Sequence, residues 1–162
     1  MDTYSLAQSV GELLNKQHLT LGLAESCTGG LIATYITDIP GSSASFEGGL
    51  VAYSYQVKER MLGVPANILE RDGAVSAETV MAMARGARKV LKVDVALAIT
   101  GIAGPSGGTP DKPVGLTYIG LASPRGELWR KYIWQGDRRE NREQSARAAL
   151  ELLKDHLEGP VE

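Results

Sequence analysis

The sequence is poor in the residues on which several common kinds of site depend. Its 162 residues include one cysteine and two histidines. A single cysteine excludes an internal disulfide and a zinc site built on cysteines. Two histidines argue against a serine–histidine triad and leave few ligands for a transition metal. Because these ligands are scarce, we expect no metal and no cofactor. No apolar run approaches the ~20 residues that a membrane-spanning helix needs, so we expect no membrane contact.

The sequence also has little net charge. The 17 Lys and Arg nearly balance the 19 Asp and Glu, for a formal net charge of −2, so the composition does not favour nucleic-acid binding. The segment Met1-Asp2-Thr3-Tyr4-Ser5 lacks the basic and apolar regions of a secretory signal, and we expect a cytoplasmic protein. The 19 glycines exceed average usage and gather in loops. That pattern indicates binding surfaces built from backbone.

The apolar pattern predicts helices alternating with strands. Apolar residues at helical spacing indicate helices over 4–17, about 28–38, from 55, in a short turn over 66–71, from 77 and from 137. Apolar runs bounded by turn residues indicate strands over 19–25, 46–53, 93–100, 114–122 and 127–135. This order predicts a single domain over residues 1–162 with an α/β fold, a three-layer α/β/α sandwich with a mixed sheet.

Polar residues mark where three of these helices begin. Ser54 and Ser76 stand where an N-cap is expected. Asp137, with Glu140 three residues later, has the spacing of a capping box. We therefore expect these side chains to bond the first free amides of their helices.

The stretch Ala24-Glu25-Ser26-Cys27-Thr28-Gly29-Gly30 lies between a predicted strand and a predicted helix. A sharp turn there exposes a side chain at the carboxyl end of the sheet and aims backbone amides at whatever binds. Because sites of such sheets form beyond the carboxyl ends of the strands, we expect segments 25–30, 53–58 and 100–113 to converge. The local sequence leaves two interpretations open: Ser26 is a nucleophile, or the serine and threonine cap a helix.

A nucleophilic Ser26 needs a base, and histidine does not offer one. His18 and His156 stand near the ends of the two terminal helices, where we expect them to be solvated. Lys58, in the first turn of the helix after the second strand, is the candidate, provided that its pKa falls from ~10.4 toward ~7–8. Burial and the positive end of its helix both act in that direction. Tyr53 stands close enough in sequence to assist, and a surface lysine is the alternative interpretation.

Three further features bear on this site. Cys27 is the rival nucleophile, but without a histidine to lower its pKa we interpret it as a small buried residue. Arg138 and Arg142 stand at the start of the last helix, where a cation gains nothing from the helix dipole. Their placement therefore suggests an anionic ligand, with solvated charge as the alternative. The glycine-rich loop over 101–110 would either cradle an anion with its amides or form a long flexible loop.

Seven segments in unbroken order over about residues 5–155 resemble the family of the CinA C-terminal domain, the nicotinamide-nucleotide amidases. The matching segments are AESCTGG (24–30), TDIPGSS (37–43), VAYS (51–54) with Lys58, GAVS (73–76), ITGIAGP (99–105) with Gly107-Gly108, KPVG (112–115) and GDR (136–138). Each segment alone is weak, whereas the ordered set is specific. The resemblance implies that nicotinamide mononucleotide is the substrate, hydrolysed at its carboxamide to nicotinate mononucleotide and ammonia without a metal.

The resemblance also implies roles for individual residues. Ser26 looks like the nucleophile and Lys58 like its base, with Tyr53 assisting. Thr100 would lie near the reacting amide and Arg138 would bind the nucleotide. Amides of the turn at Gly29, or of the turn at Thr100–Gly101, would hold the oxyanion. The residues that would contact substrate are Thr28, Gly29, Gly30, Gly101 and Arg138.

Another class of function stays open at this point. A non-catalytic nucleotide-sensing or protein-interaction module fits the association of the family with competence and DNA damage. Hydrolysis through Cys27 is a third interpretation, which predicts inactivation by iodoacetamide and survival of Ser26→Ala. The sequence leaves a homo-oligomer open.

Overall fold

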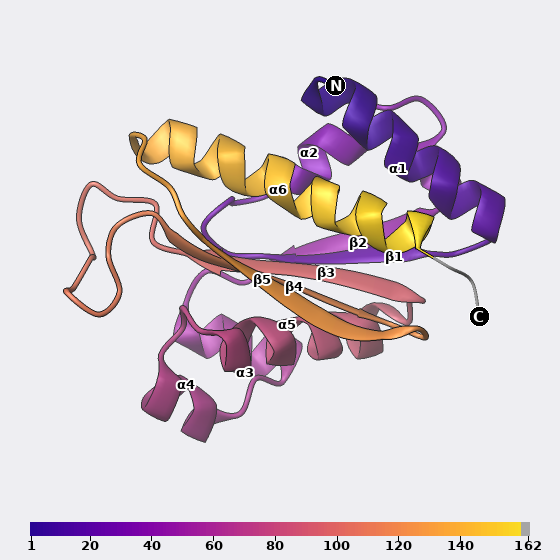
Figure 1. Cartoon of the computed structure of the whole chain (residues 1–162). Coiled ribbons are helices and arrows are strands. Elements are labelled where there is room, and N and C mark those ends of the chain that lie inside the picture. Colours follow the sequence, from indigo (N-terminus) through magenta and orange to yellow (C-terminus); the bar gives the residue numbers. More distant parts are fainter. Residues whose placement is uncertain (160–162) are drawn as a thin grey trace.

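A five-stranded sheet lies between two layers of helices (Figure 1). The computed structural model describes residues 1–159. The strands are β1 (Leu21–Glu25), β2 (Phe46–Val51), β3 (Val95–Gly101), β4 (Leu116–Ser123) and β5 (Gly126–Ile133). The α-helices are α1 (Thr3–Gln17), α2 (Leu31–Thr37), α3 (Tyr55–Leu62), α4 (Ala66–Asp72), α5 (Ala77–Leu91) and α6 (Arg138–Glu158), with a short 3-10 helix at Ser42–Ala44.

The sheet is mixed, with strand order β2-β1-β3-β4-β5. β1 pairs in parallel with β2 and β3, whereas β4 is antiparallel to β3 and β5 is antiparallel to β4. Helices α1, α2 and α6 cover one face, and α3, α4 and α5 cover the other (Figure 1). The predicted three-layer α/β/α sandwich with a mixed sheet is confirmed, with the apolar run at 93–100 as its central strand.

The two faces of the sheet carry side chains of different size. Along β3, Leu97 and Ile99 pack under α1, α2 and α6, while Ala96 and Ala98 face α5. On β4, a Cβ at Gly120 would come within 3.0 Å of the sulfur of Met81 in α5. Small residues therefore let α5 lie close to the sheet, and the larger side chains fill the space beneath the opposite layer.

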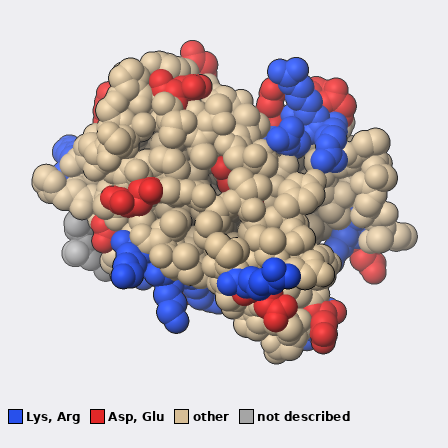
Figure 2. Space-filling model, turned by 180° about the vertical axis from the view of Figure 1, so that it is seen from behind, with Lys and Arg blue, Asp and Glu red and all other residues tan. Residues whose placement is uncertain are grey.

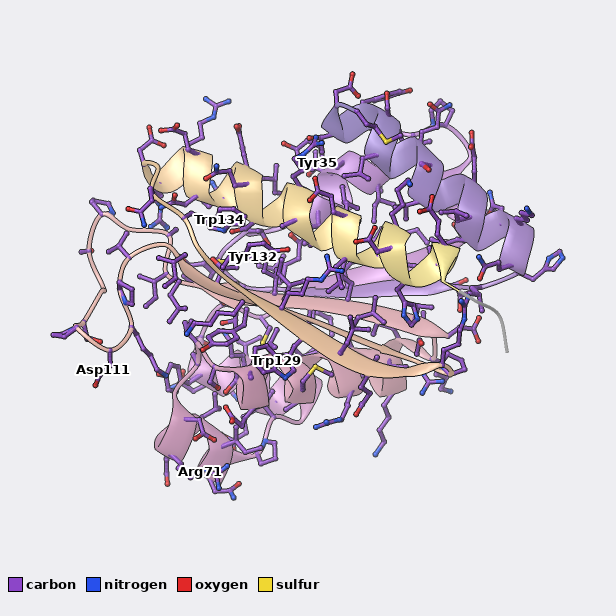
Figure 3. The ribbon with its side chains drawn as sticks, in the orientation of Figure 1. Tyr35, Arg71, Asp111, Trp129, Tyr132 and Trp134 are labelled. Atoms are coloured by element: carbon purple, nitrogen blue, oxygen red, sulfur yellow. The ribbon has the colours of Figure 1, made fainter. Side chains whose placement is uncertain are left out.

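Aromatic side chains of β5, and of Trp134 directly after it, lie on both faces of the sheet. Tyr132 stacks on Trp134 with ring centroids 4.7 Å apart, and the indole of Trp134 donates to Ser145 of α6 at 2.9 Å (Figure 3). Trp129 lies on the other face of the sheet, beside Tyr118 at 5.8 Å. The alternation of β5 thus joins this edge strand to α6 on one face while leaving Trp129 about half exposed on the other.

The predicted helix starts are confirmed. Ser54 accepts from Val57 N at 3.1 Å, and Ser76 accepts from Thr79 N at 3.0 Å. Asp137 accepts from Glu140 N at 2.8 Å while the Glu140 carboxylate accepts from Asp137 N at 3.2 Å, which completes the capping box.

Helix α3 is pressed tightly against α5. A Cβ at Gly86 of α5 would lie 1.8 Å from the carbonyl oxygen of Leu62, the last residue of α3. Only glycine permits an approach this close. The contact fixes the position of the short helix that carries Lys58.

His156 departs from the prediction of a solvated side chain. It is half-buried, and its Nε2 lies 2.8 Å from Ser123 Oγ at the turn between β4 and β5. Burial and the nearby Arg125 lower its pKa. The reason is that α6 continues to Glu158 and brings its last turns against that hairpin. His18 is exposed, as predicted.

Two observations on residues 1–159 concern a membrane-spanning helix and the distribution of surface charge. Among residues 1–159, no helix is both long enough and apolar enough to span a bilayer. On the face shown in Figure 2, Lys and Arg are interspersed with Asp and Glu and leave much of the centre uncharged. This face therefore carries no continuous basic surface of the kind that nucleic acid binds.

Candidate active site

The carboxyl ends of the three parallel strands meet at one edge of the sheet. Ser26 follows β1, Lys58 lies on the helix after β2, and Thr100 is the second-to-last residue of β3. Pairing of β1 with both neighbours places Glu25 beside Val51 and Ile99. The segments 25–30, 53–58 and 100–113, which were predicted to converge, therefore do so.

Ser26 and Lys58 are in contact. Lys58 Nζ lies 2.8 Å from Ser26 Oγ. Both residues are buried, with Lys58 1% and Ser26 7% exposed. The amine also donates to the backbone carbonyls of Ala52 at 2.8 Å and Tyr53 at 3.0 Å. A neutral amine has two N–H groups and one lone pair. If the two carbonyls take the N–H groups, the lone pair is left for the hydroxyl proton of Ser26.

The surroundings set the protonation of this pair. Burial lowers the pKa of Lys58 from 10.5 to about 8, because a charged amine loses its hydration there. Burial has the opposite effect on the neighbouring thiol and raises the pKa of Cys27 to about 12. Near neutral pH the amine can therefore act as a base, whereas Cys27 remains an unreactive thiol.

Tyr53 approaches Lys58 through its backbone rather than its ring. Tyr53 is 59% exposed, and its phenol oxygen accepts from Arg138 Nη2 at 3.2 Å. The same guanidinium donates from Nη1 to the carbonyl of Gly104 at 2.7 Å. Arg138 thus joins the start of α6 to the loops after β2 and β3, and its remaining N–H groups are available to a ligand.

Thr100 and Gly101 lie where β3 ends, packed against β4. Thr100 is 1% exposed and its hydroxyl donates to the carbonyl of Ala74 at 2.8 Å. At Gly101 a Cβ would come within 2.8 Å of Thr117 Oγ1 and 3.2 Å of Cys27 Sγ. The glycine is therefore required by close packing beneath the Ser26 turn.

Glu25 is a functional candidate that sequence reasoning missed. Its carboxylate is buried and accepts from Thr28 Oγ1 at 2.6 Å, Ile32 N at 2.9 Å and Ala33 N at 3.1 Å. The amides of Ile32 and Ala33 lie in the first turn of α2, so two of the amides that we expected to face a ligand already bond a carboxylate. The available signal was an acidic residue at the end of an otherwise apolar strand.

Arg142 also has a role that differs from the expected one. It donates from Nε to the carbonyl of Cys27 at 3.0 Å and from Nη2 to the carbonyl of Thr28 at 2.9 Å. Gly29 and Gly30, at φ 61° and 104°, complete the turn in a conformation that suits glycine. Of the two arginines predicted to meet an anion, Arg142 therefore holds the turn that follows Ser26.

The first turns of α6 carry a group of arginines. An open hollow of about 490 Å³ beside the first turns of α6 is lined by Leu31, Arg138, Arg139, Arg142 and Glu143. Asn141 holds the adjoining loop by donating to the carbonyl of Ala103 at 3.0 Å. Among residues 1–159, no three His, Cys, Asp or Glu side chains are grouped as a metal site requires.

The fold and the site together define an α/β domain with a buried serine–lysine pair at the carboxyl edge of its sheet. The CinA C-terminal domain family matches residues 3–157, and the chain belongs to that family. A CinA-like protein of Geobacter sulfurreducens is 53% identical over 149 residues, which are 92% of this chain and 36% of the relative. The chain spans less than two fifths of the curated relatives it matches.

Solved structures agree with this assignment. The crystal structure of the competence/damage inducible protein CihA from Agrobacterium tumefaciens superposes with a TM-score of 0.94 at 40% identity, covering 98% of this chain and 97% of the other. A CinA superfamily protein from Escherichia coli superposes with a TM-score of 0.88 at 31% identity, covering 95% and 92%. Both likenesses extend over nearly the whole chain.

Proposed function

We propose that this domain is an amidohydrolase that converts nicotinamide mononucleotide to nicotinate mononucleotide and ammonia. The observation that carries the proposal is the 2.8 Å contact between Lys58 Nζ and Ser26 Oγ in a buried site. The lowered pKa of the amine supports a base at this position, and the resemblance to the nicotinamide-nucleotide amidases supplies the substrate.

The proposed reaction has two stages. Neutral Lys58 removes the proton of Ser26 as the hydroxyl oxygen attacks the carboxamide carbon. The tetrahedral intermediate collapses with transfer of a proton from Lys58 to the leaving nitrogen, and ammonia departs. Water then attacks the resulting ester, again with Lys58 as base, and releases the nicotinate nucleotide and free Ser26. The positive charge of the pyridinium ring activates the carbonyl, so a modest nucleophile suffices.

Arg138 is the proposed contact for the nucleotide phosphate. It is exposed at the start of α6 and keeps N–H groups free beyond its bonds to Tyr53 and Gly104. A planar guanidinium suits a phosphate, which accepts two parallel hydrogen bonds. Thr100 and the phenol of Tyr53 are proposed to line the path of the substrate rather than to move protons.

The test is ammonia release from nicotinamide mononucleotide by the wild type, Ser26→Ala and the control Ser43→Ala, which changes an exposed serine in the 3-10 helix. We expect activity in the wild type and the control and a loss of at least ~10³-fold in Ser26→Ala. Unchanged turnover in Ser26→Ala contradicts the serine mechanism. Tight nucleotide binding without product in the wild type favours a non-catalytic sensing or interaction module instead.

A further inference from the structure

The turn that carries Ser26 leaves few amides free to stabilise an oxyanion. Ser26 N donates to the carbonyl of Ile99 at 3.1 Å, and Gly29 N donates to the carbonyl of Ser26 at 3.0 Å. The amide of Gly29, one of the donors expected from the sequence, is therefore already bonded. Within residues 1–159, the amides of Cys27, Thr28 and Gly30 donate to no protein acceptor.

Burial and distance from Ser26 along the chain decide which of these three amides can stabilise an oxyanion. Thr28 is fully buried, so its amide is closed to a ligand. Gly30 is four residues beyond the nucleophile, at the N-cap of α2. Cys27 directly follows Ser26, and the oxygen that becomes negative is bonded to the same carbon that Ser26 attacks. The amide of Cys27 is therefore the free donor next to the reacting carbon.

The orientation of the Cys27 amide depends on Arg142 through the backbone. Arg142 holds the carbonyl of Thr28, which belongs to the same planar peptide unit as the amide of Gly29. That amide bonds the carbonyl of Ser26, which belongs to the same planar unit as the amide of Cys27. A second bond from Arg142 to the carbonyl of Cys27 holds the next peptide unit. One guanidinium on α6 thus fixes three successive peptide units.

We infer that Arg142 is a positioning residue that aims the amide of Cys27 at the oxyanion formed on Ser26. The inference rests on the proposed function. Glu25 holds the far end of the turn through Thr28 and the first amides of α2. The turn is therefore braced by a carboxylate on one side and a guanidinium on the other, and its donor needs no reorganisation when charge develops.

The variants Arg142→Gln and Arg142→Lys test the inference. Glutamine loses the charge and the two-point contact. Lysine keeps the charge but offers one nitrogen in place of the two, Nε and Nη2, with which Arg142 reaches the two carbonyls. Arg147→Gln is the matched control, because Arg147 lies on the same helix and also holds a distant backbone carbonyl, that of Met1 at 2.6 Å. Each variant is measured for kcat, for KM, and for binding of an aldehyde analogue of the substrate that forms an oxyanion on Ser26.

We expect Arg142→Gln to lose about 10²–10³-fold in kcat and a similar factor in aldehyde affinity, with KM and nicotinate mononucleotide affinity changed less than about threefold. Arg142→Lys should fall between it and the wild type, and the control should match the wild type. A lower melting temperature with unchanged kcat and aldehyde affinity overturns the inference. If Arg142→Gln does not fold, wild-type values in Arg142→Lys overturn it.

Acylation of Ser26 by p-nitrophenyl acetate separates this inference from the proposed function. The ester also forms an oxyanion on Ser26 but needs no nucleotide recognition. If the wild type leaves nicotinamide mononucleotide intact yet is acylated, the proposed substrate fails, and a slower acylation of Arg142→Gln still supports the positioning role. A wild type that is not acylated at Ser26 by either compound overturns both.

Discussion

The low pKa of Lys58 should be measurable as a pH dependence of folding stability. In the folded protein the amine has a pKa of about 8, against 10.5 for an ordinary lysine. Between these two values the unfolded chain binds one more proton than the folded chain does. The free energy of unfolding is therefore highest above pH 10.5, and the part that depends on Lys58 is lost as pH falls toward 8.

The magnitude follows from the difference between the two pKa values. At about 1.4 kcal/mol per pH unit, the interval from 8 to 10.5 corresponds to about 3 kcal/mol. Lys58→Met removes the titrating group and leaves a side chain of similar length. It also removes the donor to Ala52 and Tyr53, but that cost does not change with pH. The pH-dependent part of the difference between wild type and variant therefore belongs to Lys58.

The assay is urea unfolding of the wild type and Lys58→Met at intervals from pH 7 to 11. We expect the free energy of unfolding of the wild type to rise relative to the variant by about 3 kcal/mol across the interval. Lys89→Met, at an exposed position on α5, is the control and should give a constant difference. Parallel curves for Lys58→Met would refute the lowered pKa. On the same reasoning, kcat/KM of the wild type should rise with pH to a plateau above about 8.

Two further predictions concern neighbouring residues. Cys27→Ala should keep its activity within about threefold, and iodoacetamide should leave the wild type active at pH 7.5, because the thiol is buried with a pKa of about 12. Mass spectrometry after incubation checks for alkylation, and rapid inactivation through alkylation of Cys27 would contradict the prediction. Arg138→Ala should raise KM for nicotinamide mononucleotide about tenfold but leave KM for nicotinamide riboside nearly unchanged; steady-state ammonia release measures both, and an equal rise for the two substrates would remove the phosphate contact.

Much of the fold could be predicted because local signals agree with it. The apolar run at 93–100 identified the central strand, and Ser54, Ser76 and Asp137 each cap the helix expected of them. The convergence of three loops followed from the common direction of the parallel strands. Contact between Ser26 and Lys58 did not follow from spacing, since 32 residues separate them and a surface lysine has the same local sequence.

The remaining features depend on distances that the sequence does not contain. Arg142 lies 114 residues from Thr28, and α6 brings its guanidinium to that carbonyl only when both pack on one face of the sheet. Glu25 looked like the end of a strand, and its bonds to α2 appear only once the turn is closed. His156 reads as an exposed helix end until α6 meets the β4–β5 hairpin.

The partners of Lys58 and Arg142 have a consequence for changing the specificity of the proposed site. Lys58 is oriented by the carbonyls of Ala52 and Tyr53, and Arg142 by the carbonyls of Cys27 and Thr28. Carbonyls of the main chain survive any side-chain replacement. Positions 27 and 53 can therefore be randomised in a search for activity on other amides, and tolerance there will be limited by packing rather than by loss of these contacts.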